Sequence, residues 1–281
     1  MTIFVSTDWL AAELGAPDLR ILDATLFLPG TPRDARTEFE AAHIPGAAFL
    51  DLDTLADPAD PAPHTLPTDD MMTQRLQALG VDADSRIILY DNSPIRSAAR
   101  AWWMARLYGV GASAAILDGG LPKWLADGHP TETGHATTTP GNAIARIDRA
   151  QVRTKADLLA NLDSGDAQVL DARGAGRFTG TEAEPRPGMA SGHIPGSRNL
   201  PYAALFAADN SLKSDEELQT LFAEAGIDLD RPVITTCGSG VTAAILLAGL
   251  ERLGNADVTL YDGSWSEWGL DPATPKATGA A

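Results

Sequence analysis

The sequence of 281 residues contains a single cysteine, Cys237. One cysteine excludes an intramolecular disulfide, a CxxC redox pair and a zinc site built from cysteines. Basic residues are also scarce, because 21 lysines and arginines stand against 38 aspartates and glutamates, for a net charge of -17. Such a chain repels phosphate backbones and acidic membranes, so we expect neither nucleic acid nor a membrane as a partner. An anionic ligand therefore needs a local cluster of basic side chains.

Long apolar runs are missing as well. No stretch approaches the roughly 20 apolar residues that span a bilayer. Residues 1–8 have neither the basic nor the apolar region of a signal peptide. We therefore expect a cytoplasmic protein. The apolar fraction of 44% is typical of globular proteins, and the length allows two α/β domains of ordinary size.

The cysteine stands at the junction of a predicted strand and a predicted helix. Residues 231–236 have the pattern of a short strand, and residues 241–253 that of a helix. The intervening Gly-Ser-Gly at 238–240 lets the backbone curl, so that successive N–H groups can point at one anion. Because a helix N-terminus favours negative charge, such a position favours a thiolate. We interpret Cys237 as a nucleophile; the alternative is a small buried residue of the core.

The two halves of the chain repeat the same series of short patterns. His-Ile-Pro-Gly occurs at 43–46 and 193–196, and Asp-Gly occurs at 118–119 and 262–263. Two pairs of strand patterns fall in the same order, at 21–25 with 169–173 and at 86–91 with 231–237. A repeat of this length indicates a duplicated domain. We expect domains at residues 1–130 and 147–281, joined by a linker at 131–146 that is rich in threonine, glycine and proline.

Strands alternate with helices in each half. The expected helices lie at residues 70–79, 98–108, 214–225 and 241–253. This alternation predicts an α/β fold, in which each domain has a parallel sheet with right-handed crossovers and helices on both faces. Functional loops gather at the carboxyl ends of such strands. The cysteine loop and the loop after Asp171 are therefore expected at one edge of a sheet.

An arginine-rich segment follows Asp171. Residues 173–186 lack apolar periodicity and carry three arginines among glycines and prolines, so we expect an irregular loop. In an acidic protein such a cluster suits a carboxylate substrate, because a guanidinium can bind a carboxylate through two hydrogen bonds. Ion pairing with Asp171, Glu182 or Glu184 is the alternative, and the residue pattern alone favours it.

Other polar and aromatic residues have less specific contexts. His64 lies with several aspartates in a polar loop at residues 51–67, where acid–base chemistry and simple solvation are both possible. The histidines of the repeated His-Ile-Pro-Gly occur in both halves, so we interpret them as structural residues that hydrogen-bond the following turn. Trp265 and Trp268 could line a small pocket, but their counterpart Trp124 in the first half favours packing in the core.

The duplicated His-Ile-Pro-Gly and Asp-Gly patterns, with one cysteine loop in the second half, resemble the tandem-domain rhodanese superfamily over nearly the whole chain. The loop Cys-Gly-Ser-Gly-Val-Thr at 237–242 is similar to that of its 3-mercaptopyruvate branch. The thiosulfate branch typically carries basic residues where Gly238 and Ser239 stand. The resemblance implies two rhodanese-like domains with the active site at their interface. It also implies a first domain without a nucleophile, since Asp91 stands near the place of the cysteine.

The same resemblance implies roles for particular residues. Cys237 would take the sulfur of 3-mercaptopyruvate as a persulfide and release pyruvate, while Arg177 and Arg186 bind the substrate carboxylate. Asp53, His64 and Ser239 would form a proton relay. The backbone that holds the transferred sulfur would belong to Gly238, Gly240, Val241 and Thr242. Thioredoxin, a small thiol or cyanide would accept the sulfur, since the chain has no second cysteine, and no metal or organic cofactor is implied.

Three other functions are alternatives to this one. Thiosulfate is the alternative sulfur donor for the same nucleophile. A rhodanese-like module that binds a partner without catalysis is the alternative outside enzymology. A cysteine phosphatase needs Cys-x5-Arg, and the residue at that position is Ala243, so no arginine closes the loop around a phosphate.

Overall fold

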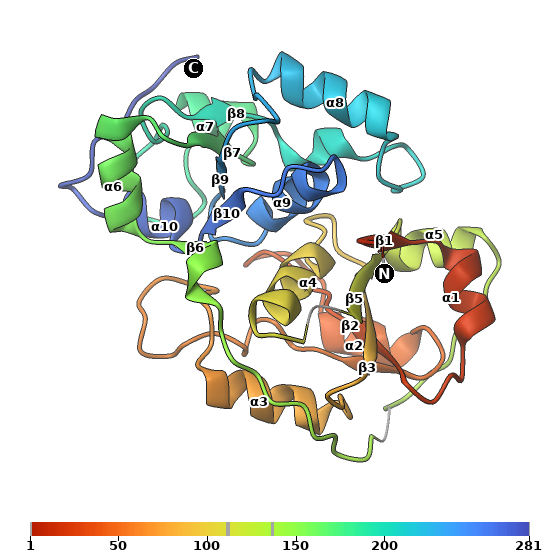
Figure 1. Cartoon of the computed structure of the whole chain (residues 1–281). Coiled ribbons are helices and arrows are strands. Elements are labelled where there is room, and N and C mark those ends of the chain that lie inside the picture. The colour runs from red at the N-terminus through yellow and green to blue at the C-terminus, as the bar shows by residue number, and fades with distance from the viewer. Residues whose placement is uncertain (1, 111–112, 136–137, 281) are drawn as a thin grey trace. The chain divides into compact units, whose positions relative to one another are not determined.

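The computed structural model of the chain describes residues 2–110, 113–135 and 138–280, which fold into two compact units (Figure 1). The first unit consists of the residues up to Asp57, Leu66–Asp148 and Phe206–Leu212. The second unit consists of Pro58–Thr65, Arg149–Leu205 and the residues from Lys213 onward. Each unit therefore includes a short segment that the sequence places in the other half.

Each unit contains a five-stranded parallel sheet, and the two sheets have the same strand order. In the first unit the order is β1-β5-β4-β2-β3, with β1 (Phe4–Val5), β2 (Leu19–Asp23), β3 (Ala47–Phe49), β4 (Arg86–Tyr90) and β5 (Ala114–Leu117). In the second unit it is β6-β10-β9-β7-β8, with β6 (Val152–Arg153), β7 (Gln168–Asp171), β8 (Arg198–Asn199), β9 (Val233–Thr236) and β10 (Val258–Tyr261). The predicted α/β fold with duplicated parallel sheets is confirmed.

Helices connect the strands of each sheet. The first unit has α1 (Thr7–Glu13), α2 (Ala35–Ala41), α3 (Asp69–Ala78), α4 (Ala98–Leu107) and α5 (Gly120–Ala126). The second has α6 (Lys155–Ser164), α7 (Ala175–Thr179), α8 (Asp215–Glu224), α9 (Ala243–Arg252), α10 (Ser264–Trp268) and the short 3₁₀ helices η2 (Arg149–Gln151) and η3 (Tyr202–Leu205). The four predicted helices are present as α3, α4, α8 and α9. Within the part of the chain that the structure describes, every helix is too short or too polar to span a bilayer.

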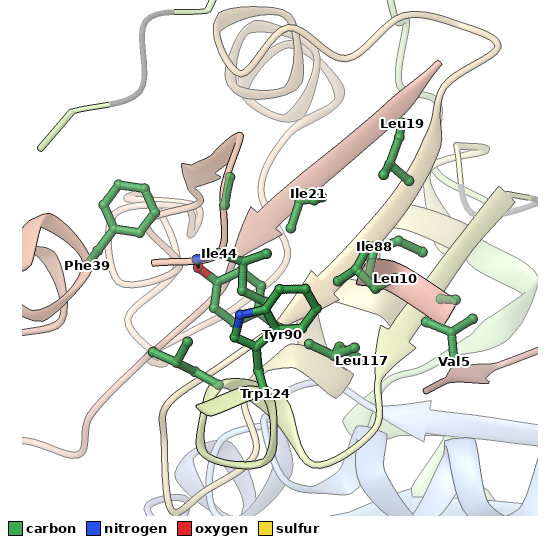
Figure 2. Close-up of a cluster of buried hydrophobic side chains, with 13 residues drawn as sticks. Val5, Leu10, Leu19, Ile21, Phe39, Ile44, Ile88, Tyr90, Leu117 and Trp124 are labelled. Carbon is green, nitrogen blue, oxygen red and sulfur yellow. Dashed lines mark hydrogen bonds between the residues drawn. The ribbon is translucent and has the colours of Figure 1, made fainter. Parts of the chain in front are cut away.

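Side chains on one face of the first sheet pack against α1, α2 and α5. Figure 2 shows Ile88 and Tyr90 of β4 in this cluster, together with Leu10 of α1 and Trp124 of α5. Successive residues of a strand point to opposite faces, so the intervening residues of β4 point to the other side of the sheet, where α4 packs on β4 and β5. Both faces of the sheet are therefore covered, which explains why β4 is apolar from Ile87 onward.

The second sheet has an equivalent core. Its strands contribute Val169, Ile234 and Tyr261, which pack with Leu158 of α6. Trp265 and Trp268 of α10 are fully buried in the same cluster, which confirms their predicted packing in the core. Because these two rings are buried in the core, α10 is held firmly in place beside the carboxyl ends of the strands.

The repeated histidines are structural, but their hydrogen bonds differ from the prediction. His43 Nδ1 lies 2.7 Å from the carbonyl oxygen of Phe39, and the two rings stack with their centroids 4.0 Å apart. His193 makes the same pair of contacts with Phe178, at 2.9 and 3.8 Å. The expected bond to the following turn is therefore wrong. Each imidazole instead holds a carbonyl that precedes it in the chain.

Asp23 and Asp171 end equivalent strands but have different partners. Asp171 forms a buried ion pair with Arg173, with 2.7 Å between Oδ2 and Nη2. Both carboxyl groups accept a hydrogen bond of 2.9 Å from the backbone N–H two residues later, but for Asp23 that residue is the uncharged Thr25, where the second unit has Arg173. Burial raises the pKa of Asp23 to about 6 and the charge of Asp91 adds to the rise, while hydrogen bonds from Thr25 and Tyr90 oppose it.

This raised pKa makes stability depend on pH. Between about pH 4 and 6 the folded state binds a proton at Asp23 that the unfolded chain has released, so the free energy of unfolding falls as the pH rises. The contribution is at most roughly 3 kcal/mol across this window. Asp23→Asn keeps an oxygen acceptor for Thr25 and removes the titration. Urea unfolding at several pH values should therefore show a shallower fall in stability for the variant, and identical slopes would contradict the assignment.

Candidate active site

Cys237 directly follows the carboxyl end of β9, and α9 begins at Ala243. The side chain of Cys237 is almost fully buried, with 2% of the residue exposed. Within the loop between them, Gly240 has a φ of 76°, in the left-handed region that favours glycine. The strand, turn and helix predicted around the cysteine are therefore present, and the turn depends on Gly240.

Helix α10 fixes the direction of the peptide groups in this loop. The carbonyl oxygen of Cys237 accepts a hydrogen bond of 3.0 Å from the N–H of Trp265. The carbonyl oxygen of Gly238 accepts bonds from both the N–H and the hydroxyl of Ser266, at 2.8 and 2.6 Å. In a trans peptide the C=O and the N–H point in opposite directions. The N–H groups of Gly238 and Ser239 therefore point away from α10.

Ser264 supports the same loop through the backbone N–H of Cys237. Its hydroxyl accepts a hydrogen bond of 3.2 Å from the N–H of Cys237 and donates one of 2.9 Å to the carbonyl of Tyr261. Ser264 has a φ of 49°, a left-handed conformation that is uncommon outside glycine. The sequence shows the repeated Asp-Gly pattern just before α10, but it does not show that the residues of α10 after this pattern hold the cysteine loop.

The first unit shows what kind of group such a loop accommodates. Asp91 follows β4 as Cys237 follows β9, and it is buried. Its carboxylate accepts hydrogen bonds from the N–H groups of Ser93 and Ala98, at 3.0 and 2.8 Å. Burial raises the pKa of Asp91, and these two N–H donors act in the opposite direction. The loop between this strand and helix thus presents backbone N–H donors to a buried carboxyl group, even in the half without a cysteine.

The arginine-rich segment contains a short helix that the sequence did not predict. Helix α7 carries Arg177, whose guanidinium lies against the cysteine loop: a Cβ atom built on Gly238 would be 3.0 Å from Nη2 of Arg177. A side chain larger than glycine at position 238 would therefore crowd the guanidinium. Arg177 also donates two hydrogen bonds to one oxygen of Glu184, at 3.1 and 2.5 Å.

Glu184 is a further candidate for the site. From the sequence alone it is one of three possible ion-pair partners of the arginines. Its side chain is 1% exposed, and its two oxygens bind different arginines, Arg173 at 2.6 Å and Arg177 at 2.5 Å. Arg173 is fully buried, pairs with Asp171, and lies 4.4 Å from the ring centroid of Trp265. Arg173 therefore has an ion-pairing role. Through Glu184, the same network of ion pairs also orients Arg177. The charges of the four linked residues, Asp171, Arg173, Glu184 and Arg177, sum to zero.

Arg186 carries a positive charge outside this set of four residues. Its Nη1 donates a hydrogen bond of 3.0 Å to the hydroxyl of Ser266, a neutral partner. Burial and the nearby Arg177 lower the pKa of Arg186, while negative charge on Cys237 and Glu184 offsets part of that effect. An anion close to Arg186 and Cys237 would therefore interact favourably with this guanidinium.

His64 belongs to the second unit, although it comes from the first half of the sequence. Its Nδ1 lies 2.9 Å from the hydroxyl oxygen of Ser239, two residues after the cysteine. His64 has a φ of 59°, so the surrounding structure holds it in a conformation that few residues other than glycine adopt. Asp53 belongs to the first unit, where it lines a cavity of about 310 Å³ with Arg36 and Phe49. Its place in the proton relay stays a prediction.

Comparison with known proteins finds sulfurtransferases that are similar to this chain in sequence and in fold. Residues 6–127 and 154–271 each match the rhodanese-like domain. A 3-mercaptopyruvate sulfurtransferase from Rattus norvegicus is 44% identical over 94% of this chain and 91% of its own. A mitochondrial thiosulfate/3-mercaptopyruvate sulfurtransferase from Arabidopsis thaliana is 41% identical over 96% and 77%. The crystal structure of a 3-mercaptopyruvate sulfotransferase from Escherichia coli superposes with a TM-score of 0.86 and 40% identity, covering 95% of this chain and all of the other.

Proposed function

The chain belongs to the rhodanese-like family, and on that premise we propose that it transfers the sulfur of 3-mercaptopyruvate through Cys237. The observation that carries this proposal is the position of Arg186. Its guanidinium is half-buried, has a neutral anchor in Ser266, and interacts with charge on Cys237. A cation at this position suits a substrate whose carboxylate lies a few bonds from its sulfur. Relatives that are named for 3-mercaptopyruvate support the same donor.

The first step forms a persulfide. The Cys237 thiolate attacks the sulfur of 3-mercaptopyruvate while Arg177 and Arg186 hold the carboxylate. The new bond joins the two sulfur atoms, and the electron pair of the broken C–S bond leaves as the enolate of pyruvate. The proton that the outer sulfur brings from the substrate thiol passes to solvent, and the N–H groups of the loop, which point away from α10, then stabilise the negative charge on that sulfur.

The enolate requires a proton to become pyruvate. His64 and Ser239 are in hydrogen-bond contact, and this pair would pass a proton to the enolate carbon or polarise the ketone oxygen. Asp53 would orient the imidazole of His64 as the third member of the relay. The histidine thus acts on the leaving group and not on the attacking thiolate.

The second step returns the cysteine to its starting form. A thiolate of the acceptor attacks the outer sulfur, a persulfide forms on the acceptor, and Cys237 leaves as a thiolate. The chain has one cysteine, so the acceptor must come from outside: thioredoxin, a small thiol or cyanide. We place this transfer in the cytoplasm, following the sequence-based expectation.

Two alternatives make different predictions for the donor. A thiosulfate sulfurtransferase would react faster with thiosulfate, and the plant relative is named for both donors. A non-catalytic module would react with neither. The cysteine loop argues for 3-mercaptopyruvate, because it has small neutral residues at 238 and 239 where a compact dianion would need cations close to its sulfur.

Steady-state kinetics with both donors test the proposal. We expect pyruvate release from 3-mercaptopyruvate to exceed turnover of thiosulfate by at least about tenfold in kcat/KM, since only the first donor places a carboxylate on the arginines. Cys237→Ser should abolish turnover of both donors, because the persulfide cannot form. Faster turnover of thiosulfate would support the first alternative. Undiminished activity of the serine variant would refute the covalent mechanism.

A second prediction separates the proton relay from sulfur transfer. His64→Gln should lower kcat with 3-mercaptopyruvate by roughly 100-fold or more, as expected for loss of a general acid. Turnover of thiosulfate should change little, because sulfite leaves without a proton. The exposed His135 provides a matched control, and His135→Gln should leave both rates unchanged. An equal loss with both donors would show that His64 supports the loop and does not transfer protons.

A further inference from the structure

We infer that Ser266 is a positioning residue that holds Arg186 in register with the cysteine loop. This inference rests on the proposed binding of the substrate carboxylate by Arg186. Ser266 lies in α10, is 1% exposed, and belongs to none of the groups that the mechanism requires to react. The short helix that carries it also holds the peptides of Cys237 and Gly238.

The hydroxyl of Ser266 has a fixed orientation. It carries one hydrogen, which it donates to the carbonyl of Gly238 at 2.6 Å. Its lone pairs are then directed elsewhere, and one of them accepts the bond of 3.0 Å from Nη1 of Arg186. The hydroxyl therefore joins the guanidinium directly to the backbone that follows the nucleophile, and each of these two hydrogen bonds stabilises the orientation of the other.

The two candidate carboxylate-binding arginines are anchored in different ways. Glu184 anchors Arg177 with a negative charge, which neutralises much of its attraction for a substrate anion. Ser266 anchors Arg186 without any charge. A neutral anchor fixes the position of a guanidinium while its charge stays available to the ligand. Arg186 therefore supplies most of the attraction for the carboxylate, and Ser266 sets where this attraction acts.

The short distance between the sulfur and the carboxylate of 3-mercaptopyruvate explains why the position of Arg186 matters. In 3-mercaptopyruvate the sulfur and the carboxylate are separated by a short chain of two carbons. A guanidinium that binds the carboxylate therefore decides where the sulfur lies relative to Cys237. A long arginine side chain has many rotamers, and a partly buried hydrogen bond at its tip removes most of them.

Ser266→Ala tests the role of the hydroxyl. Loss of a hydrogen bond to a charged group should raise KM for 3-mercaptopyruvate by about tenfold, with a smaller change in kcat. Ser266→Thr and Ser266→Val form a matched pair, because the two side chains have similar size and only threonine keeps the hydroxyl. We expect threonine to restore a KM near that of the wild type and valine to resemble alanine. Thermal unfolding of each variant shows whether it is folded.

A double-mutant cycle with Arg186→Ala separates the possible outcomes. If Ser266 acts through Arg186, then Ser266→Ala should change KM by less than about twofold once Arg186 is alanine. A tenfold effect in both backgrounds would overturn the inference and show that Ser266 supports only the cysteine loop. If Arg186→Ala alone leaves KM unchanged, the proposed carboxylate site is wrong, whatever Ser266 does. Equal KM values for the threonine and valine variants would also contradict the inference.

Discussion

The attachment of the cysteine loop to helix α10 is the constraint on which the rest of this site depends. Two carbonyls, those of Cys237 and Gly238, accept hydrogen bonds from N–H groups of α10. This direction turns the opposite ends of the same peptides away from the helix, where they can act on a negative charge. The helix can support the loop in this way because Trp265 and Trp268 are buried in the core of the second sheet. Core packing and the chemistry of the loop are therefore connected through one five-residue helix.

The charged side chains of the site are also held in place by specific partners. Asp171, Arg173, Glu184 and Arg177 form a chain of alternating charges that sum to zero, in which the first three side chains are buried and Arg177 is partly exposed. Such a chain costs desolvation, and its value lies in the orientation that it gives to its last member. Arg186 stands outside this chain with a neutral hydrogen-bond partner. The result is one net positive charge beside the single thiol of a strongly acidic protein.

The sequence predicts the duplicated fold well, because strand and helix patterns are local and occur twice. It also places Cys237 between a strand and a helix, where the structure has it. It does not reveal Ser266, because the bond from its hydroxyl to Gly238 links positions 28 residues apart. Glu184 appeared only as one of three possible ion-pair partners, since its burial depends on tertiary packing. His64 is brought to Ser239 across 175 residues by a segment that joins the second unit, which no local pattern could indicate.

The central claim is that Cys237 carries the transferred sulfur and that pyruvate leaves as it does so. Intact-mass analysis of the reduced protein, after brief exposure to 3-mercaptopyruvate without an acceptor, tests this most directly. We expect a gain of one sulfur atom, located on the peptide that contains Cys237, with one pyruvate released per adduct. Pyruvate released over many turnovers without any sulfur adduct, or an adduct retained in Cys237→Ser, would contradict it.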